Sequence, residues 1–164
     1  MQQVLIPQFI NNKEDKVKMK VQRSIEIAAP PERIWPFLVE PEKILKWCIT
    51  LQKFEYTGKQ RSGVGTPFYF EEKAAGRLMK LNFTVTEWVE NEKLAFSMTS
   101  GNFAKGYEQR WTVKATPSGS RFTFMEQVEL PYGIIGKVIG VIGQRSSGAT
   151  VEKMLAKLKS LVEA

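Results

Sequence analysis

The chain has 164 residues, of which 43% are hydrophobic and 25% charged, as expected of a single soluble globular domain. It has no histidine and one cysteine, which excludes Ser-His-Asp and Cys-His nucleophile systems, an internal disulfide and CxxC metal sites. The net charge of +7 comes from lysines and arginines spread along the chain, a pattern typical of a soluble surface and not of a nucleic-acid partner.

Residues 1–16 are predicted to form a polar N-terminal tail or loosely docked arm, ahead of a single domain over residues 17–164. The start lacks the basic region of a secretory signal, and no apolar run approaches the roughly 20 residues that span a bilayer. A cytoplasmic location without stable membrane insertion is therefore expected.

Residues 16–27 alternate between apolar and polar side chains and predict a strand, which Pro30 and Pro31 end. Two short helices are expected next, over 32–40 and 41–49. Six further strands follow between Gly, Asn, Ser and Pro turn signals, over residues 51–58, 63–73, 76–90, 92–100, 106–115 and 120–130. From Ile134 to Val162 the pattern is helical.

Consecutive strands joined by short turns predict an antiparallel meander with one apolar face. Two-residue turns are expected at residues 74–75, 91–92 and 118–119, because each choice sends apolar side chains to a common face. The resulting partners are Phe70 with Met79, Phe96 with Glu87, and Trp111 with Glu126.

The first strand is expected to pair with the last, with Ile25 opposite Phe124 and Arg23 opposite Glu126. The two short helices then bridge to the second strand at the far edge of a curved sheet, and the C-terminal helix closes its groove. Because buried charges are costly unless paired, Arg23 and Glu126 are interpreted first as a structural ion pair, then as a ligand anchor, and last as acid/base groups. Glu87 is expected near a strand end, reaching solvent.

The segment "IEIAAPPERIWPFLVEPEKILKW" resembles the opening of the START-like (SRPBCC) superfamily, where a strand, "APxExVW" and "DPExLxxW" recur. The segment "YEQRWTVKATPSGSRFTFMEQVELPYGIIGKVIG" looks like the closing half of its polyketide cyclase/dehydrase-type members. The resemblance covers roughly residues 17–163. It implies an α+β helix-grip fold: a curved seven-stranded antiparallel sheet wrapped around a long C-terminal helix, with a cavity between them and two short helices after the first strand. Some relatives carry a histidine where this chain has Tyr107, so histidine-dependent chemistry is not expected.

The face toward the helix is predicted to combine apolar walls with a few polar anchors, as small-molecule pockets do. Its candidate ligand-binding residues are Phe68, Phe70, Leu81, Phe83, Phe96, Met98, Tyr107, Gln109, Trp111 and Phe124, with Glu126 and Arg23 as charged candidates. A closed core without ligand space is the alternative. The small residues of segment 143–150 either leave volume opposite these rings or form a kink or loop. Cys48 is expected to be a buried, unreactive side chain.

Three classes of function remain. The first is a carrier or sensor of a hydrophobic small molecule, lipid- or polyketide-like. The second is a polyketide cyclase or dehydratase working without metal, cofactor or histidine. The third is a protein-interaction module of the chaperone-activator type. Binding is favoured because few polar groups converge in the predicted cavity; no catalytic residue is assigned, and a monomer or weak homodimer is expected.

Overall fold

The computed structural model describes the backbone of residues 17–74, 76–102, 104–130 and 134–164. The predicted tail, residues 1–16, lies outside this range. The chain forms eleven described elements, and their bounds are β1 Val17–Ile27, α1 Pro31–Ile34, α2 Pro36–Val39, α3 Pro41–Trp47, β2 Leu51–Tyr56, β3 Pro67–Ala74, β4 Arg77–Val89, β5 Lys93–Gly101, β6 Gly106–Thr116, β7 Gly119–Leu130 and α4 Ile134–Glu163.

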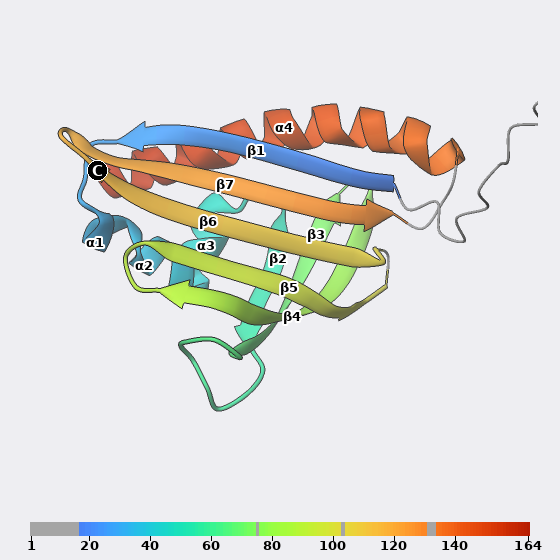
Figure 1. Ribbon diagram of the computed structural model, residues 1–164, viewed down its shortest axis with the longest axis horizontal. Helices are drawn as coiled ribbons and strands as arrows, with labels where there is room; N and C mark the ends of the chain where they lie inside the picture. The colour runs from blue at the N-terminus through green and yellow to red at the C-terminus, as the bar shows by residue number, and fades with distance from the viewer. Residues whose placement is uncertain (1–16, 75, 103, 131–133) are drawn as a thin grey trace, which may run out of the picture.

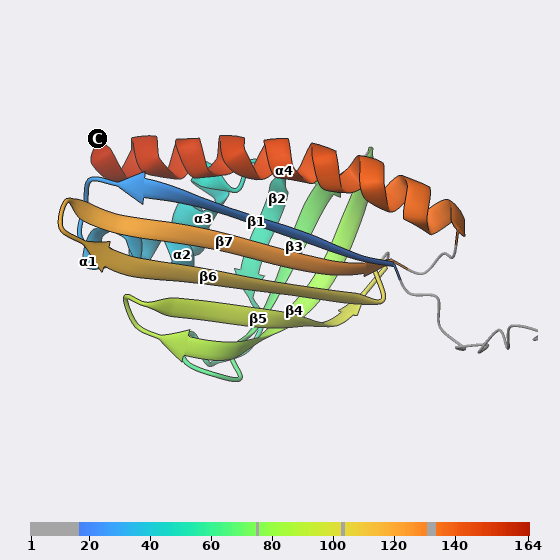
Figure 2. The same cartoon turned by 45° about the horizontal axis from the view of Figure 1, so that its top comes forward.

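The strands form one seven-stranded sheet in the order β1-β7-β6-β5-β4-β3-β2, with antiparallel neighbours throughout. β1 therefore lies beside β7, as predicted. The helices α1 to α3 carry the chain from β1 to the opposite edge, where β2 begins (Figure 1). The long helix α4 runs alongside β1 (Figure 2). The predicted helix-grip fold is confirmed.

A proline divides the first of the two predicted short helices. Pro36 has no backbone N–H to donate, so segment 32–40 becomes α1 and α2 instead of one helix. Each piece still closes its own turn, because Trp35 N–H donates to the Pro31 carbonyl and Glu40 N–H donates to the Pro36 carbonyl. The bridge between the two sheet edges is thus a compact series of three short helices.

Side-chain periodicity explains how the core forms. Every second residue of β6 points to the concave face, so Tyr107, Gln109, Trp111 and Val113 are all buried. The C-terminal half of α4 places a helical stripe against this core, and its buried members are Val151, Met154, Leu155, Leu158 and Val162. The small-residue segment 143–150 lies within continuous helix, so the alternative of a loop there is wrong.

Two hairpin turns lie one residue away from their predicted positions. β6 and β7 pair Thr116 with Gly119, and β3 and β4 pair Ala74 with Arg77. Moving a two-residue turn by one position moves every partner by two, which keeps each side chain on its face. Phe70 therefore lies opposite Leu81 and not Met79, and Trp111 lies opposite Phe124 and not Glu126.

The hairpin between β4 and β5 differs because its turn has three residues, with Asn91 at φ 63°. A bulge follows between Val85 and Glu87. Phe96 consequently lies opposite Val85, and the predicted pairing of Phe96 with Glu87 is wrong. The Glu87 carboxylate instead accepts a hydrogen bond from Arg110 at 2.9 Å; the side chain is 37% exposed, as expected, although Oε2 is buried.

The predicted register of β1 on β7 is also wrong by two residues. Val21 lies opposite Glu126, Arg23 opposite Phe124 and Ile25 opposite Phe122. The ends of β1 and α4 are joined by polar contacts: the Ala28 N–H donates to Glu163 Oε1 at 2.7 Å, and Lys159 Nζ donates to the Glu26 carbonyl at 2.6 Å. These contacts hold the last turn of α4 against the edge of the sheet.

Glycine at position 119 is required by the close approach of β1. Its φ is +146°, and a Cβ there would fall within contact distance of the Ile27 carbonyl oxygen and 2.9 Å from the Ala29 nitrogen. These are backbone atoms at the end of β1, so they cannot move aside as a flexible side chain would. Gly76 also has a positive φ, +74°, but nothing lies within 4 Å of its Cβ position.

We expect Gly119→Ala to lower the free energy of unfolding by about 3 kcal/mol or more, because backbone strain adds to overpacking. Gly76→Ala serves as the matched control and is expected to cost only about 1 kcal/mol, from conformation alone. Urea denaturation of both variants measures the difference. Equal losses would contradict the close approach of Gly119 to β1.

Candidate functional site

By strand register the concave face carries all twelve residues predicted to bind a ligand, but Arg23, on the edge strand, is exposed. Met98 and Glu126 are half-buried, and the other nine are buried: Phe68, Phe70, Leu81, Phe83, Phe96, Tyr107, Gln109, Trp111 and Phe124. Their rings form a continuous aromatic cluster, in which Phe70 and Phe83 stack at 4.5 Å and Phe83 meets Tyr107 edge-on at 5.5 Å. The predicted alternation thus places these side chains together.

A hydrogen-bonded polar cluster interrupts this aromatic face. It consists of Glu72 at the end of β3, Tyr107 and Gln109 on β6, and Glu126 on β7. Tyr107 Oη lies 2.7 Å from Glu126 Oε2 and 3.1 Å from Glu72 Oε2. The Gln109 amide nitrogen donates to Tyr107 Oη and to Glu126 Oε2, both at 3.0 Å. One phenol therefore joins two carboxyl groups.

Two further side chains fix the orientation of the cluster. Trp111 Nε1 donates to Gln109 Oε1 at 2.9 Å, which directs the Gln109 amide nitrogen toward Tyr107 and Glu126. Thr50 Oγ1 donates to Glu72 Oε1 at 2.9 Å. Because Gln109 lies directly opposite Glu126 in the β6–β7 ladder, their contact follows from strand register.

Burial dominates the electrostatics of this cluster. The pKa of Glu126 is raised to about 8. Burial is the largest cause and the charge of Glu72 adds to it, while hydrogen bonds from Tyr107 and Gln109 oppose the shift. Burial likewise raises the pKa of Glu72. It also raises the pKa of the Tyr107 phenol and of the Cys48 thiol, so both keep their protons at neutral pH. At neutral pH the two carboxyl groups together retain a proton.

Glu72 is the functional candidate that sequence reasoning missed. Its signal was present, because Phe68, Phe70 and Glu72 share one face of β3 by simple alternation. The tandem Glu71-Glu72 suggests a solvated strand end, yet only Glu71 lies on the outer face, where it accepts a hydrogen bond from Tyr69. The carboxylate of Glu72 turns inward to Thr50 and Tyr107.

Arg23 does not pair with Glu126, which corrects the sequence prediction. Its side chain is exposed, and Nε lies 3.0 Å from Glu152 Oε1 on α4. The guanidinium crosses α4 at Gly148, where a Cβ would lie 2.6 Å from Arg23 Nη2. β1 is an edge strand, so a long side chain on its inner face can pass the helix and reach water.

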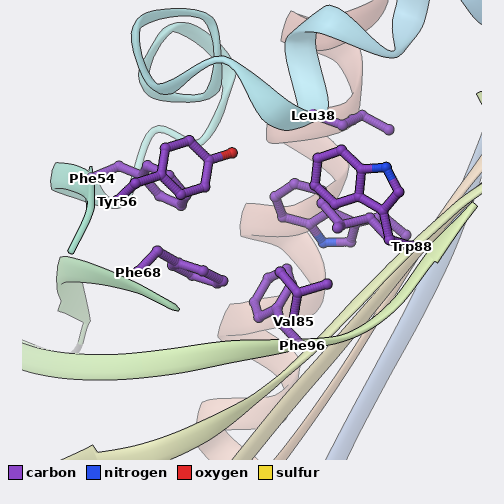
Figure 3. A pocket seen from close by; sticks show the side chains of 9 residues that line it. Leu38, Phe54, Tyr56, Phe68, Val85, Trp88 and Phe96 are labelled. Carbon is purple, nitrogen blue, oxygen red and sulfur yellow. The ribbon is translucent and has the colours of Figure 1, made fainter. Parts of the chain in front are cut away.

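A small cavity lies at the other end of the aromatic cluster, between α2 and strands β2 to β6. Figure 3 shows the rings of Phe54, Tyr56 and Phe68 on the left and the side chains of Leu38 and Trp88 on the right. Its volume is about 10 Å³, which admits roughly one water molecule. Trp111 lines this cavity and also bonds Gln109, so it contacts both the cavity and the polar cluster.

Metal binding has no support in the described part of the chain, where no three His, Cys, Asp or Glu residues are placed to hold an ion. Nor does any described helix have the length and apolar character needed to cross a bilayer. What the site offers chemically is an apolar surface with two half-buried carboxyl groups, Glu72 and Glu126, held in a network of hydrogen bonds.

We expect a double-mutant cycle of Arg23→Met with Glu152→Gln to give a coupling free energy below about 1 kcal/mol, because the two side chains are 43% and 63% exposed. The cycle of Arg23→Met with Glu126→Gln is expected to give none. Chemical denaturation measures both couplings. A coupling of several kcal/mol between Arg23 and Glu126 would restore the original prediction and contradict this register.

The raised pKa of Glu126 predicts how stability depends on pH. The folded protein keeps this proton up to about pH 8, whereas a carboxyl in the unfolded chain loses it near 4.5. The folded state therefore binds more protons between these values, and the free energy of unfolding should fall as pH rises, by at most about 1.4 kcal/mol per pH unit for one proton.

Glu126→Gln should flatten this decline, which denaturant unfolding at pH 5, 6, 7 and 8 would measure. The matched control is Glu108→Gln, which removes an exposed carboxyl group from the outer face of β6. A decline equally steep in the wild type and in Glu126→Gln would show that Glu126 does not hold a proton in the folded protein.

Solved structures with the same fold come from several bacteria. The protein TTHA0849 of Thermus thermophilus is 23% identical, with a TM-score of 0.72 over 89% of this chain and 97% of that one. A START superfamily protein from Mycobacterium smegmatis is 18% identical, with a TM-score of 0.72 over 88% and 97%. The di-domain ARO/CYC protein StfQ from the steffimycin biosynthetic pathway is 11% identical, with a TM-score of 0.72 over 90% of this chain and 52% of that one.

Among curated proteins, no sequence match was found. The model of the family described as polyketide cyclase/dehydrase and lipid transport matches residues 18–163, which is nearly the whole chain. The match agrees with the helix-grip fold and with the aromatic concave face. The chain therefore belongs to the polyketide cyclase/dehydrase and lipid transport family.

Proposed function

We propose that this protein binds a hydrophobic small molecule, lipid- or polyketide-like, between the concave face of the sheet and α4, and that it acts as a carrier or sensor. The observation that supports this proposal is the composition of the concave face. Aromatic and aliphatic side chains surround a polar cluster in which Glu126 keeps accessible surface. This combination of apolar walls and few polar groups is typical of small-molecule sites.

The ligand is proposed to lie along the part of this face that carries Tyr107 and Glu126. The small cavity beside Trp88 and Leu38 is too small for it, since about 10 Å³ admits roughly one water. A polar cluster of this kind has a cost in a folded protein, because buried carboxyl groups are poorly solvated. Recognition of a polar group on a ligand gives a reason for its presence.

A cyclase or dehydratase activity is the second candidate. One specific observation favours it: burial raises the pKa of Glu126 to about 8, which suits a group that donates a proton near neutral pH.

The interaction-module alternative has less support. The exposed large apolar residues of the described chain come from four separate places: Ile49, Val64, Leu78 and Val89.

Binding can be tested by thermal shift and native mass spectrometry against fatty acids, sterols, flavonoids and polyketides. A ligand at about 100 times its dissociation constant should add roughly 2.7 kcal/mol to the free energy of unfolding. Tyr107→Phe removes one hydroxyl from the concave face and should weaken binding without loss of the fold. Tyr69→Phe, on the outer face of β3, is the matched control. If no class of hydrophobe binds, or if both variants behave alike, the proposed site is wrong.

A further inference from the structure

One oxygen of the polar cluster has no partner within the described chain. Glu126 Oε2 is bonded by Tyr107 and Gln109, but Glu126 Oε1 makes no hydrogen bond to any described residue. The side chain is half-buried on the concave face, and a bound molecule that reaches it would meet an oxygen without a partner among the described residues. What that molecule must offer depends on where the protons of the cluster lie.

The protons can be counted from the contacts around Tyr107. Its hydroxyl has one hydrogen, and its oxygen lies near three polar atoms: Glu126 Oε2, Glu72 Oε2 and the Gln109 amide nitrogen. Gln109 donates to this oxygen, because Trp111 fixes the orientation of its amide. One of the two carboxyl contacts therefore receives the Tyr107 hydrogen, and the other requires a hydrogen from the carboxyl itself.

Two arrangements satisfy this count. In the first, Glu126 carries a proton on Oε2 and donates it to Tyr107, which donates to Glu72. In the second, Tyr107 donates to Glu126 Oε2, and Glu72 carries the proton. The raised pKa of Glu126 favours the first. A proton on Glu126 Oε1 with Glu126 Oε2 bare does not satisfy the first arrangement, because two lone pairs would then face each other across 2.7 Å.

Both arrangements leave Glu126 Oε1 as a hydrogen-bond acceptor. We propose that the ligand of this site presents a hydrogen-bond donor, a hydroxyl or an amine, to Glu126 Oε1; this inference rests on the proposed ligand-binding function. Hydrophobes whose polar group only accepts, such as ketones, find no donor in this oxygen. Ligands with a carboxylate are disfavoured further. Their negative charge would meet that of the Glu72–Glu126 pair, and no described lysine or arginine pairs with Glu72 or Glu126 to offset it.

The experiment compares naphthalene probes that share one ring system and differ in the polar group. They are 2-naphthalenemethanol, 2-(aminomethyl)naphthalene, 2-acetylnaphthalene and 2-naphthoate, with 2-methylnaphthalene as the apolar reference. Calorimetry or fluorescence titration of the full chain at pH 7 measures each affinity. The alcohol and the amine should bind about tenfold more tightly than the ketone and the carboxylate, the effect of one hydrogen bond made or left unmade.

Two variants test the role of the oxygen itself. Glu126→Gln keeps a carbonyl oxygen and an N–H donor in place of the protonated carboxyl, so the preference for donors should remain. Glu126→Met has similar volume but no acceptor, so the alcohol and the ketone should bind equally. Far-UV circular dichroism and a cooperative urea transition of both variants are the check that they remain folded.

The outcomes separate the two proposals. If all five probes bind the wild type with equal affinity, or if Glu126→Met keeps the preference for donors, the inference about Glu126 is wrong while hydrophobic binding stands. If neither these probes nor the wider panel of hydrophobes binds, the proposed function itself is wrong, and the inference falls with it. Tighter binding of the ketone or the carboxylate than of the alcohol would also overturn the inference.

Discussion

The antiparallel pairing of β1 with β7 is the contact on which the rest of this structure depends. It places the first strand of the domain beside the last, so α1 to α3 must carry the chain to the opposite edge before the meander begins. It also gives α4 an edge to lie against. Contacts from Glu26 and Ala28 to the last turn of the helix then join two segments more than 130 residues apart in the chain.

This pairing has its own strict requirement at the β6–β7 turn. Gly119 lies under the end of β1, and Ser120 Oγ donates to the Ala29 carbonyl at 2.7 Å where β1 leaves the sheet. Both residues are small because backbone atoms approach there. The same hairpin determines which residues of β6 and β7 face each other, so the geometry at this turn is transmitted along the strands to Gln109 and Glu126.

The polar cluster on the concave face works against the stability of the fold. Burial raises the pKa values of Glu72 and Glu126, which means that the folded state disfavours their charged forms. Every hydrogen bond of the cluster except that from Thr50 involves Tyr107 or Gln109, both held by the aromatic side chains around them. An apolar frame thus surrounds two hydrogen-bonded carboxyl groups, and in both proton arrangements that fit the contacts Glu126 Oε1 is left as an acceptor.

Strand alternation in the sequence by itself determined the face on which Phe70, Tyr107, Gln109 and Glu126 lie, because side chains alternate with a period of two. The short turns between consecutive strands predicted the order of the meander. It did not determine their partners, because a shift of two residues preserves every face and changes every pair. Only the tertiary structure decided that Glu126 meets Gln109 and Tyr107, that Glu72 joins them, and that Arg23 passes Gly148 to reach Glu152. Turn geometry, the bulge in β4 and the position of α4 select among these registers, and each depends on contacts between residues far apart in the chain.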